Sequence, residues 1–286
     1  MRICRFDDNR IGVVDGAHVR DVTDIRSALR LPVWPRIYYD PLVELIQNDP
    51  AAIRRLAEKA KPIPLSGVRL LSPVATPSRI IALPTSYRSH VQEAKSDPIL
   101  AQHITQKSGA EVRTFIKASP SLVGPGEGVA MRFTDKRNDP ELELAIVIGR
   151  PCDRVSEADA LKYVAGYTIG LDMTLRESGP PSGRKSIDTY SVLGPWLVTS
   201  DELPDASNLQ MTLRVNGEVR QKAPTSDLLY SLPQIIAYCA SMYHMQPGDV
   251  IMTGTPDGVA PIKPGDVLDA EIEGIGAMKV AIRAYG

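Results

Sequence analysis

Short strand-like segments separated by glycine and proline turns constrain this chain more than any other feature of its sequence. Three such segments lie near 249–253, 267–273 and 277–284, and Pro-Gly-Asp turns or a Gly-Ile-Gly corner separate them. Two hydrophobic segments, at 142–149 and 166–172, predict buried strands. We therefore predict a β-rich α+β fold with a barrel-like centre and a few covering helices.

Helical segments are fewer. We predict helices near 41–47, 51–60 and 232–242, and one from a cap at Ser156 to about residue 164. The first strands break at turn sequences, and several prolines after residue 60 mark a connector. We therefore predict a small N-terminal domain at 1–70 and a main domain at 71–286.

Composition excludes several classes of function. Lys and Arg number 33 against 34 Asp and Glu, and aromatic residues make up 5%, which gives no basis for binding nucleic acid or an anionic membrane. Cys4, Cys152 and Cys239 form no Cys-x-x-Cys pair, so neither a disulfide framework nor a zinc knuckle is indicated. No apolar run is long enough for a signal peptide or a membrane helix. We expect a cytoplasmic enzyme that acts on small molecules.

Two glutamates open the predicted strand at 142–149. Alternate side chains of a strand share a face, so Glu141 and Glu143 point to one side, about 7 Å apart, and Leu142 and Leu144 to the other. For this pair alone, the plainer interpretation is a solvent-facing edge without a special role.

Asp172 changes that interpretation. It ends the next predicted strand of a strand-helix-strand unit, and such a connection tends to bring its strands side by side. Three converging carboxylates repel one another unless a cation lies among them. An all-oxygen set suits Mg²⁺ or Mn²⁺, with Ca²⁺ as an alternative and Zn²⁺ disfavoured. We predict that Glu141, Glu143 and Asp172 bind a catalytic metal.

His90 and Glu93 lie three residues apart in a predicted helix that follows Pro84, with Thr85 or Ser86 as its cap. A carboxylate against an imidazole raises the basicity of the ring and fixes its tautomer, as a general base requires. The spacing alone fits an exposed ion pair equally well.

Eight segments in order resemble the fumarylacetoacetate hydrolase family, over roughly residues 80 to 280. They are Tyr87-x-x-His90-x-x-Glu93; Phe115-Ile-Lys117 with Leu122-Val-Gly-Pro-Gly126; Glu141–Gly149; Gly166–Arg176; Lys185-Ser-Ile-Asp188-Thr; Leu193-Gly-Pro-Trp196; Val215-Asn-Gly-Glu218; and Gly248–Thr255 with the following Pro.

The resemblance implies a β-roll catalytic domain, usually a homodimer, with a small N-terminal β-containing domain. It implies that the three carboxylates hold Mg²⁺ or Mn²⁺, that His90 and Glu93 activate water, and that Lys185 stabilises developing negative charge. It also implies a set of residues that bind the substrate, namely Tyr87, Lys117, Arg176, Gly254 and Thr255.

The sequence departs from the family pattern at Ser86, where Asn is usual, at Pro140, where Tyr is usual, and at Gly179, where many members have Gln. The stretch between His90 and Lys117 is longer than in compact members, and we expect its segment 95–100 to act as a lid. These departures affect the substrate rather than the metal or the acid–base pair.

The family chemistry centres on the enolate of a 2-oxo acid. We predict hydrolysis of the C–C bond of a 2,4-dioxo acid, with water activated by His90 and Glu93. The same enolate also serves 2-oxo acid decarboxylation, dienoate isomerisation and dehydration of a 2-oxo-3-deoxy sugar acid. A catalytically idle relative kept for binding or assembly is the alternative of another class.

Overall fold

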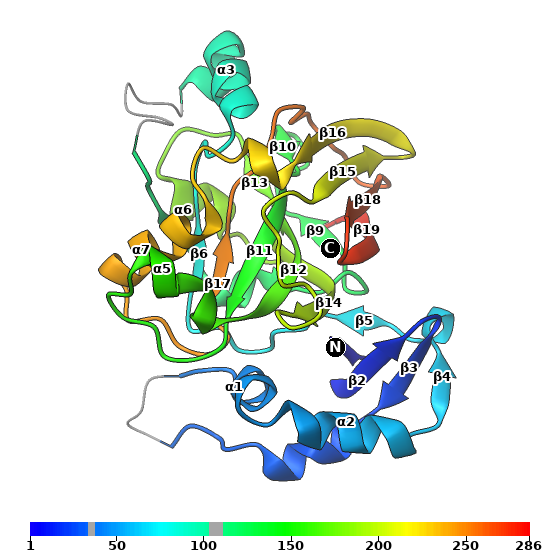
Figure 1. Cartoon of the computed structure of the whole chain (residues 1–286). Helices are drawn as coiled ribbons and strands as arrows, with labels where there is room; N and C mark the ends of the chain where they lie inside the picture. The colour runs from blue at the N-terminus through cyan, green and yellow to red at the C-terminus, as the bar shows by residue number, and fades with distance from the viewer. Residues whose placement is uncertain (34–37, 103–110) are drawn as a thin grey trace.

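The computed structural model describes residues 1–33, 38–102 and 111–286. Its main element is a mixed sheet of twelve strands (Figure 1). These strands are β1 (Arg2–Phe6), β2 (Arg10–Asp15), β3 (His18–Asp21), β4 (Pro62–Pro64), β5 (Leu70–Leu71), β6 (Ile80–Ala82), β7 (Phe115–Lys117), β8 (Leu122–Val123), β11 (Leu142–Ile148), β12 (Val164–Asp172), β14 (Ser191–Thr199) and β17 (Val250–Met252). Their order is β4-β3-β2-β1-β14-β12-β11-β17-β6-β7, while β5 pairs with β1 and β8 with β14.

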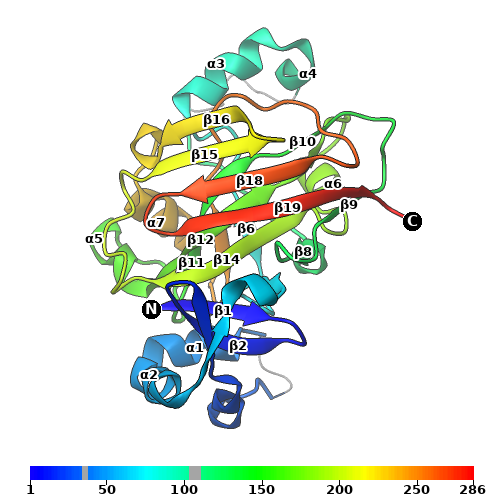
Figure 2. The same ribbon diagram turned by 90° about the vertical axis from the view of Figure 1, so that its right-hand side faces the viewer.

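A five-stranded sheet packs on one face of this sheet, and its strands run across the front of the view in Figure 2. In sheet order its strands are β16 (Glu218–Pro224), β15 (Gln210–Val215), β18 (Val267–Ile272), β19 (Gly276–Ala284) and β9 (Val129–Met131). A separate pair is formed by β10 (Asn138–Asp139) and β13 (Thr174–Leu175).

Helices cover the remaining surfaces. They are α1 (Pro41–Asn48), α2 (Pro50–Lys59), α3 (Arg88–Ser96), α4 (Pro98–Ala101), α5 (Glu157–Ala160), α6 (Pro181–Lys185) and α7 (Leu232–Met242). Short 3₁₀ segments lie at η1 (Thr23–Ala28), η2 (Leu65–Gly67), η3 (Ser119–Ser121), η4 (Leu161–Tyr163) and η5 (Thr225–Asp227). None of the helices in the described part of the chain has the length and apolar character that a membrane span requires.

The central strand β11 separates two hydrophobic cores. Leu142, Leu144 and Ile146 pack into the core shared with the five-stranded sheet. Ala145 and Val147 pack into the second core, which contains apolar side chains of α1 and α2. Because β11 pairs with β12 and β17 along its edges and a hydrophobic core covers each of its faces, the glutamates at its start are not on a solvent-facing edge. The predicted β-rich fold is confirmed.

The N-terminal strands continue the main sheet, because β1 pairs with β2 on one side and with β14 on the other. Figure 2 shows these strands and helices α1 and α2 gathered below the five-stranded sheet. The division of the chain at residue 70 stays a prediction.

One local prediction is confirmed with a difference at its end, and one was wrong. The segment after Ser156 is helical as far as Tyr163, but it consists of α5 and one 3₁₀ turn, and Val164 already pairs with Ile148 as the first residue of β12. The cap of α3 is Tyr87 rather than Thr85 or Ser86. The backbone φ of Thr85 is +48°, and the Ser86 hydroxyl donates to the carbonyl oxygen of Thr253 instead.

Candidate metal centre and active site

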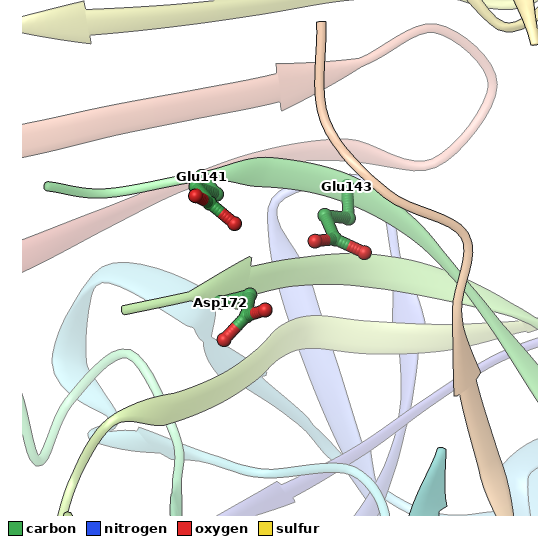
Figure 3. A group of neighbouring side chains, drawn as sticks. All are labelled: Glu141, Glu143 and Asp172. Carbon is green, nitrogen blue, oxygen red and sulfur yellow. The ribbon is translucent and has the colours of Figure 1, made fainter. Parts of the chain in front are cut away.

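Three carboxylates meet at the ends of β11 and β12. The two strands are antiparallel neighbours, and the backbone N–H of Asp172 donates to the carbonyl oxygen of Glu141 over 2.9 Å. One carboxylate oxygen each from Glu141, Glu143 and Asp172 lies within 4.8 Å of the others, and all three side chains are buried. Figure 3 shows the three carboxylates facing a common space. The convergence predicted from the sequence is therefore present in the structure.

The charges in this cluster are unequally balanced. Burial opposes ionisation of Glu141, but the positive charges of Lys185 and Arg176 outweigh it and hold the pKa of Glu141 below its usual range. Glu143 shows the opposite behaviour. Burial, and then the negative charges of Asp172 and Glu141, raise the pKa of Glu143 well above its usual value. The nearby charge of Lys185 lowers the pKa of Glu143 but does not outweigh these effects.

Two lysines, Lys185 and Lys117, form ion pairs with carboxylates of the cluster. Lys185 Nζ lies 2.7 Å from Glu141 Oε2 and 2.7 Å from Asp172 Oδ2, and it donates to Thr174 Oγ1 over 2.6 Å. Lys117 Nζ donates to Asp172 Oδ1 and, over 2.9 Å, to the carbonyl oxygen of Tyr190. Lys117 is fully buried, and this burial lowers its pKa against the opposing effect of Asp172.

The carboxylates fit a divalent cation. Their oxygens converge and are all of the hard type that Mg²⁺ and Mn²⁺ prefer. Burial and the two like-charged neighbours raise the pKa of Glu143. A bound cation would supply positive charge at Glu143. Glu141, Glu143 and Asp172 are thus the residues that could hold it.

Arg176 connects the cluster to a second carboxylate. Its Nη2 lies 2.6 Å from Glu141 Oε1, and its Nε lies 2.8 Å from Asp139 Oδ2. Asp139 is also bound by Arg137, whose Nη1 reaches Asp97 Oδ2 over 3.0 Å. Since the Asp97 side chain accepts from two backbone N–H groups at the start of α4, the network ties α4 to Glu141.

His90 and Glu93 form the contact that their spacing predicts. His90 Nδ1 lies 2.9 Å from Glu93 Oε2, and Glu93 Oε1 accepts from the backbone N–H of Gly258 over 2.8 Å. His90 is only 6% exposed. Because His90 is buried, the pair is not an exposed ion pair. The second carboxylate oxygen of Glu93 is in addition held by a backbone N–H that lies 165 residues further along the chain.

Gly254 supports Glu143 through its backbone. Its N–H donates to Glu143 Oε2 over 2.5 Å, and its φ is +94°. A Cβ atom at this position would lie 1.8 Å from the Ser86 hydroxyl oxygen. Only glycine combines this backbone conformation with this close approach.

Two of the predicted substrate-binding residues, Thr255 and Tyr87, lie in different surroundings. Thr255 is buried beside the carboxylate cluster, and its Oγ1 accepts from Gln221 Nε2 over 2.8 Å. The Tyr87 hydroxyl instead lies 3.8 Å from Met211 Sδ in the hydrophobic core. Tyr87 therefore supports the start of α3, and its direct contact with substrate stays a prediction.

A cavity of about 40 Å³ joins these groups. His90, Glu141, Arg176, Lys185 and Thr255 line it, and α3 and α4 contribute Ala94 and Leu100 to its wall. The predicted lid segment therefore borders the site. The rest of the longer insertion, residues 103–110, lies outside the described residues.

Four residues of the site were not found from the sequence. They are Asp139, Thr174, Arg184 and Gln221. Asp139 carried a signal, because it precedes Glu141 by two positions and so continues the same alternation. Arg184 lies beside Lys185 in the sequence, but no pattern marked it. Gln221 reaches the site from the five-stranded sheet, where it also accepts from the backbone N–H of Leu142 over 2.9 Å.

Comparison with known proteins agrees with this geometry. A family model described as Fumarylacetoacetate (FAA) hydrolase C-terminal matches residues 79–283. The chain belongs to the fumarylacetoacetate hydrolase family. The resemblance inferred from the eight segments is confirmed, and the matched region contains every predicted site residue.

Two similar relatives illustrate the range of the family. A maleylpyruvate hydrolase from Aquipseudomonas alcaligenes is 50% identical over 291 residues, which cover 99% of this chain and 100% of the relative. A mitochondrial oxaloacetate tautomerase from Bos taurus is 36% identical over 214 residues, which cover 71% of this chain and 90% of that protein.

A similar solved structure is that of a maleylpyruvate hydrolase from Sphingobium sp. SYK-6 in complex with manganese (II) ion and pyruvate. It is 34% identical to this chain, the match covers 100% of both chains, and the TM-score is 0.84. The similarity therefore includes the N-terminal elements as well as the carboxylate strands.

Proposed function

We propose that this protein is a divalent-metal-dependent hydrolase that cleaves a C–C bond in an acylpyruvate, a 2,4-dioxo acid, and releases pyruvate. One observation carries the proposal: Glu141, which belongs to a cluster of three buried carboxylates, lines a cavity together with His90 of the histidine–glutamate pair. The similarity to two maleylpyruvate hydrolases supports the same reaction.

Glu141, Glu143 and Asp172 would hold Mg²⁺ or Mn²⁺, the cations that suit their oxygen atoms. When bound, such a cation supplies a Lewis acid for the carboxylate and 2-oxo oxygens of the substrate. The manganese ion and pyruvate in the Sphingobium protein support this choice of metal and of substrate end.

His90 would act as the general base. A carboxylate can only accept, so the contact of Glu93 with Nδ1 leaves the proton on Nδ1 and the lone pair on Nε2. Nε2 takes a proton from water as the water oxygen bonds to C4 of the substrate. The C3–C4 bond then breaks, and its electron pair stays on C3 as the enolate of pyruvate. The proton on Nε2 returns to C3, and the acyl group leaves as a carboxylic acid.

Positive side chains stabilise the negative charge of this enolate. Lys185 lies against two of the carboxylates and lines the cavity, so its ammonium group adds positive charge where the enolate forms. Arg176 and Thr255 line the same cavity and would bind the carboxylate of the substrate. Lys117 lies deeper and holds Asp172 in position.

Pyruvate release tests the proposal. Purified protein is incubated with a short panel of acylpyruvates, with Mn²⁺ or Mg²⁺ and then with a chelator. Metal-dependent release that is lost in a His90→Ala protein would support it, and His18→Ala is the matched control, since His18 is exposed on β3. A folded, metal-binding protein that releases no pyruvate would refute the hydrolase assignment. Oxaloacetate, a dienoate and a deoxy sugar acid would then be assayed for decarboxylation or tautomerisation, isomerisation and dehydration.

We further propose that the protein works as a homodimer in the cytoplasm, as the family resemblance and the composition suggest. Leu161 and Met242, which are 44% and 58% exposed, lie on the contacting elements η4 and α7 and supply apolar surface for such an interface. Light scattering of the metal-loaded protein would measure the mass, and a monomer at assay concentration would refute the dimer.

A further inference from the structure

Arg184 differs from the other positive side chains of the site in its hydrogen bonding. Lys117, Lys185 and Arg176 each contact at least one carboxylate. Arg184 is 8% exposed, yet its Nε and Nη1 have no hydrogen-bond partner among the described residues. Buried N–H groups of a guanidinium are costly to leave without an acceptor, so an unpaired arginine of this kind indicates a missing ligand.

The position of Arg184 shows where that ligand would lie. The cavity beside the carboxylate cluster measures about 40 Å³, and a second, more open cavity of about 540 Å³ lies beyond α6. Within the described part of the chain, Arg184 is the one residue that lines both. A substrate whose 2-oxo acid end lies at the carboxylate cluster and whose acyl group enters the outer cavity would pass Arg184.

The carboxylates of the outer cavity already have partners. Asp188 contacts Arg132, and Glu177 contacts Lys136 with an N···O distance of 3.3 Å. Neither of them is therefore a partner of Arg184. Glu141 and Asp172 in the inner cluster are likewise paired with Lys185 and, for Glu141, with Arg176. The positive charge of Arg184 is thus available to an anionic group of the substrate.

We propose that Arg184 binds a second carboxylate at the far end of the acyl group, so that the preferred substrate is an acylpyruvate with two carboxylates. Arginine matches this ligand because its planar guanidinium offers two parallel N–H groups to a carboxylate. The proposal rests on the proposed acylpyruvate hydrolysis and names the class of acyl group.

The test compares two substrates and three variants. The substrates are maleylpyruvate, whose acyl group ends in a carboxylate, and an acylpyruvate of equal length that ends in a methyl group. Arg184→Met should lower kcat/KM for maleylpyruvate by about 10- to 100-fold and change that for the methyl substrate little. The loss should fall mainly on KM, and Arg184→Lys should restore part of it.

Arg132→Met is the matched control, because it removes a positive charge from the same outer cavity but one that is paired with Asp188 and stacked on Tyr285. It should alter both substrates equally. Equal losses for the two substrates in Arg184→Met, or no loss for either, would overturn the role of Arg184.

A binding measurement separates this inference from the proposed reaction. Maleate and isocrotonate, which share a cis double bond and differ in one carboxylate, are titrated calorimetrically into the Mn²⁺-loaded protein. Preference for maleate that disappears in Arg184→Met supports the inference even if no pyruvate is released, an outcome that would refute only the hydrolase assignment. No preference in the wild-type protein would refute the role of Arg184.

Discussion

Gly254→Ala is the substitution for which the structure predicts the largest effect from the smallest change. The new methyl group meets two obstacles, a φ of +94° and the Ser86 hydroxyl oxygen at 1.8 Å. A side chain held in such a backbone conformation costs about 1–3 kcal/mol. Displacing the Ser86 hydroxyl breaks its hydrogen bond to the carbonyl oxygen of Thr253, at a further cost of about 1 kcal/mol. We expect the free energy of unfolding to fall by about 2–4 kcal/mol.

The same substitution should weaken metal binding. The backbone N–H of Gly254 positions Glu143, and loss of a group that orients a metal ligand lowers affinity by about 10- to 100-fold. Urea unfolding of the metal-free protein measures the first effect, and calorimetric titration with Mn²⁺ measures the second. In a Ser86→Ala background, Gly254→Ala should cost about 1 kcal/mol less, since the obstructing hydroxyl is gone.

Gly265→Ala is the control for this reasoning. Gly265 has a similar φ of +98°, but no atom lies within 4 Å of the position of its Cβ. It should show the cost of the backbone conformation alone and normal affinity for Mn²⁺. Equal losses of stability in the two variants, together with unchanged Mn²⁺ affinity in Gly254→Ala, would refute the steric argument.

Further predictions concern charge, catalysis and the thiols. In the metal-free protein, Glu143→Gln should be more stable than wild type as pH rises above about 4.3, because the raised pKa of Glu143 means that the folded state binds its proton more tightly than the unfolded state does. Mn²⁺ at 100 times its Kd should stabilise the wild type by about 2.7 kcal/mol and the variant far less, and parallel urea-unfolding curves at all pH values would contradict this. His90→Gln should lower kcat by about 10²- to 10⁴-fold without changing Mn²⁺ affinity, and a matching loss of Mn²⁺ affinity in calorimetry would show that His90 acts on the metal site instead. Burial raises the pKa values of Cys4 and Cys239 to about 12 and that of Cys152 to about 11, so a thiol reagent at about pH 8 should label none of the three until the protein is unfolded. Rapid labelling of the native protein would show that the thiols are accessible.

Local patterns were sufficient for most elements and for the carboxylates. The alternation in Glu141–Leu144 places the glutamates on one face of a strand, because the period of two is a property of the extended backbone itself. The helix at α7 also followed from local signals, and Ser231 and Gln234 form the capping box at its start. The cap of α3 did not, since the hydroxyl of Ser86 is drawn to Thr253, a residue distant in the sequence.

The tertiary structure alone decided which side chains complete the site. Glu93 is anchored by Gly258, Leu142 by Gln221 and Lys185 by Thr174, and none of these contacts has a sequence spacing that a pattern could reveal. Arg184 is the clearest case, because its proposed role in binding substrate is inferred from its burial and from the absence of a hydrogen-bond partner for Nε and Nη1 among the described residues. Sequence specifies the local direction of a side chain, whereas its partners and its desolvation follow only when distant segments pack together.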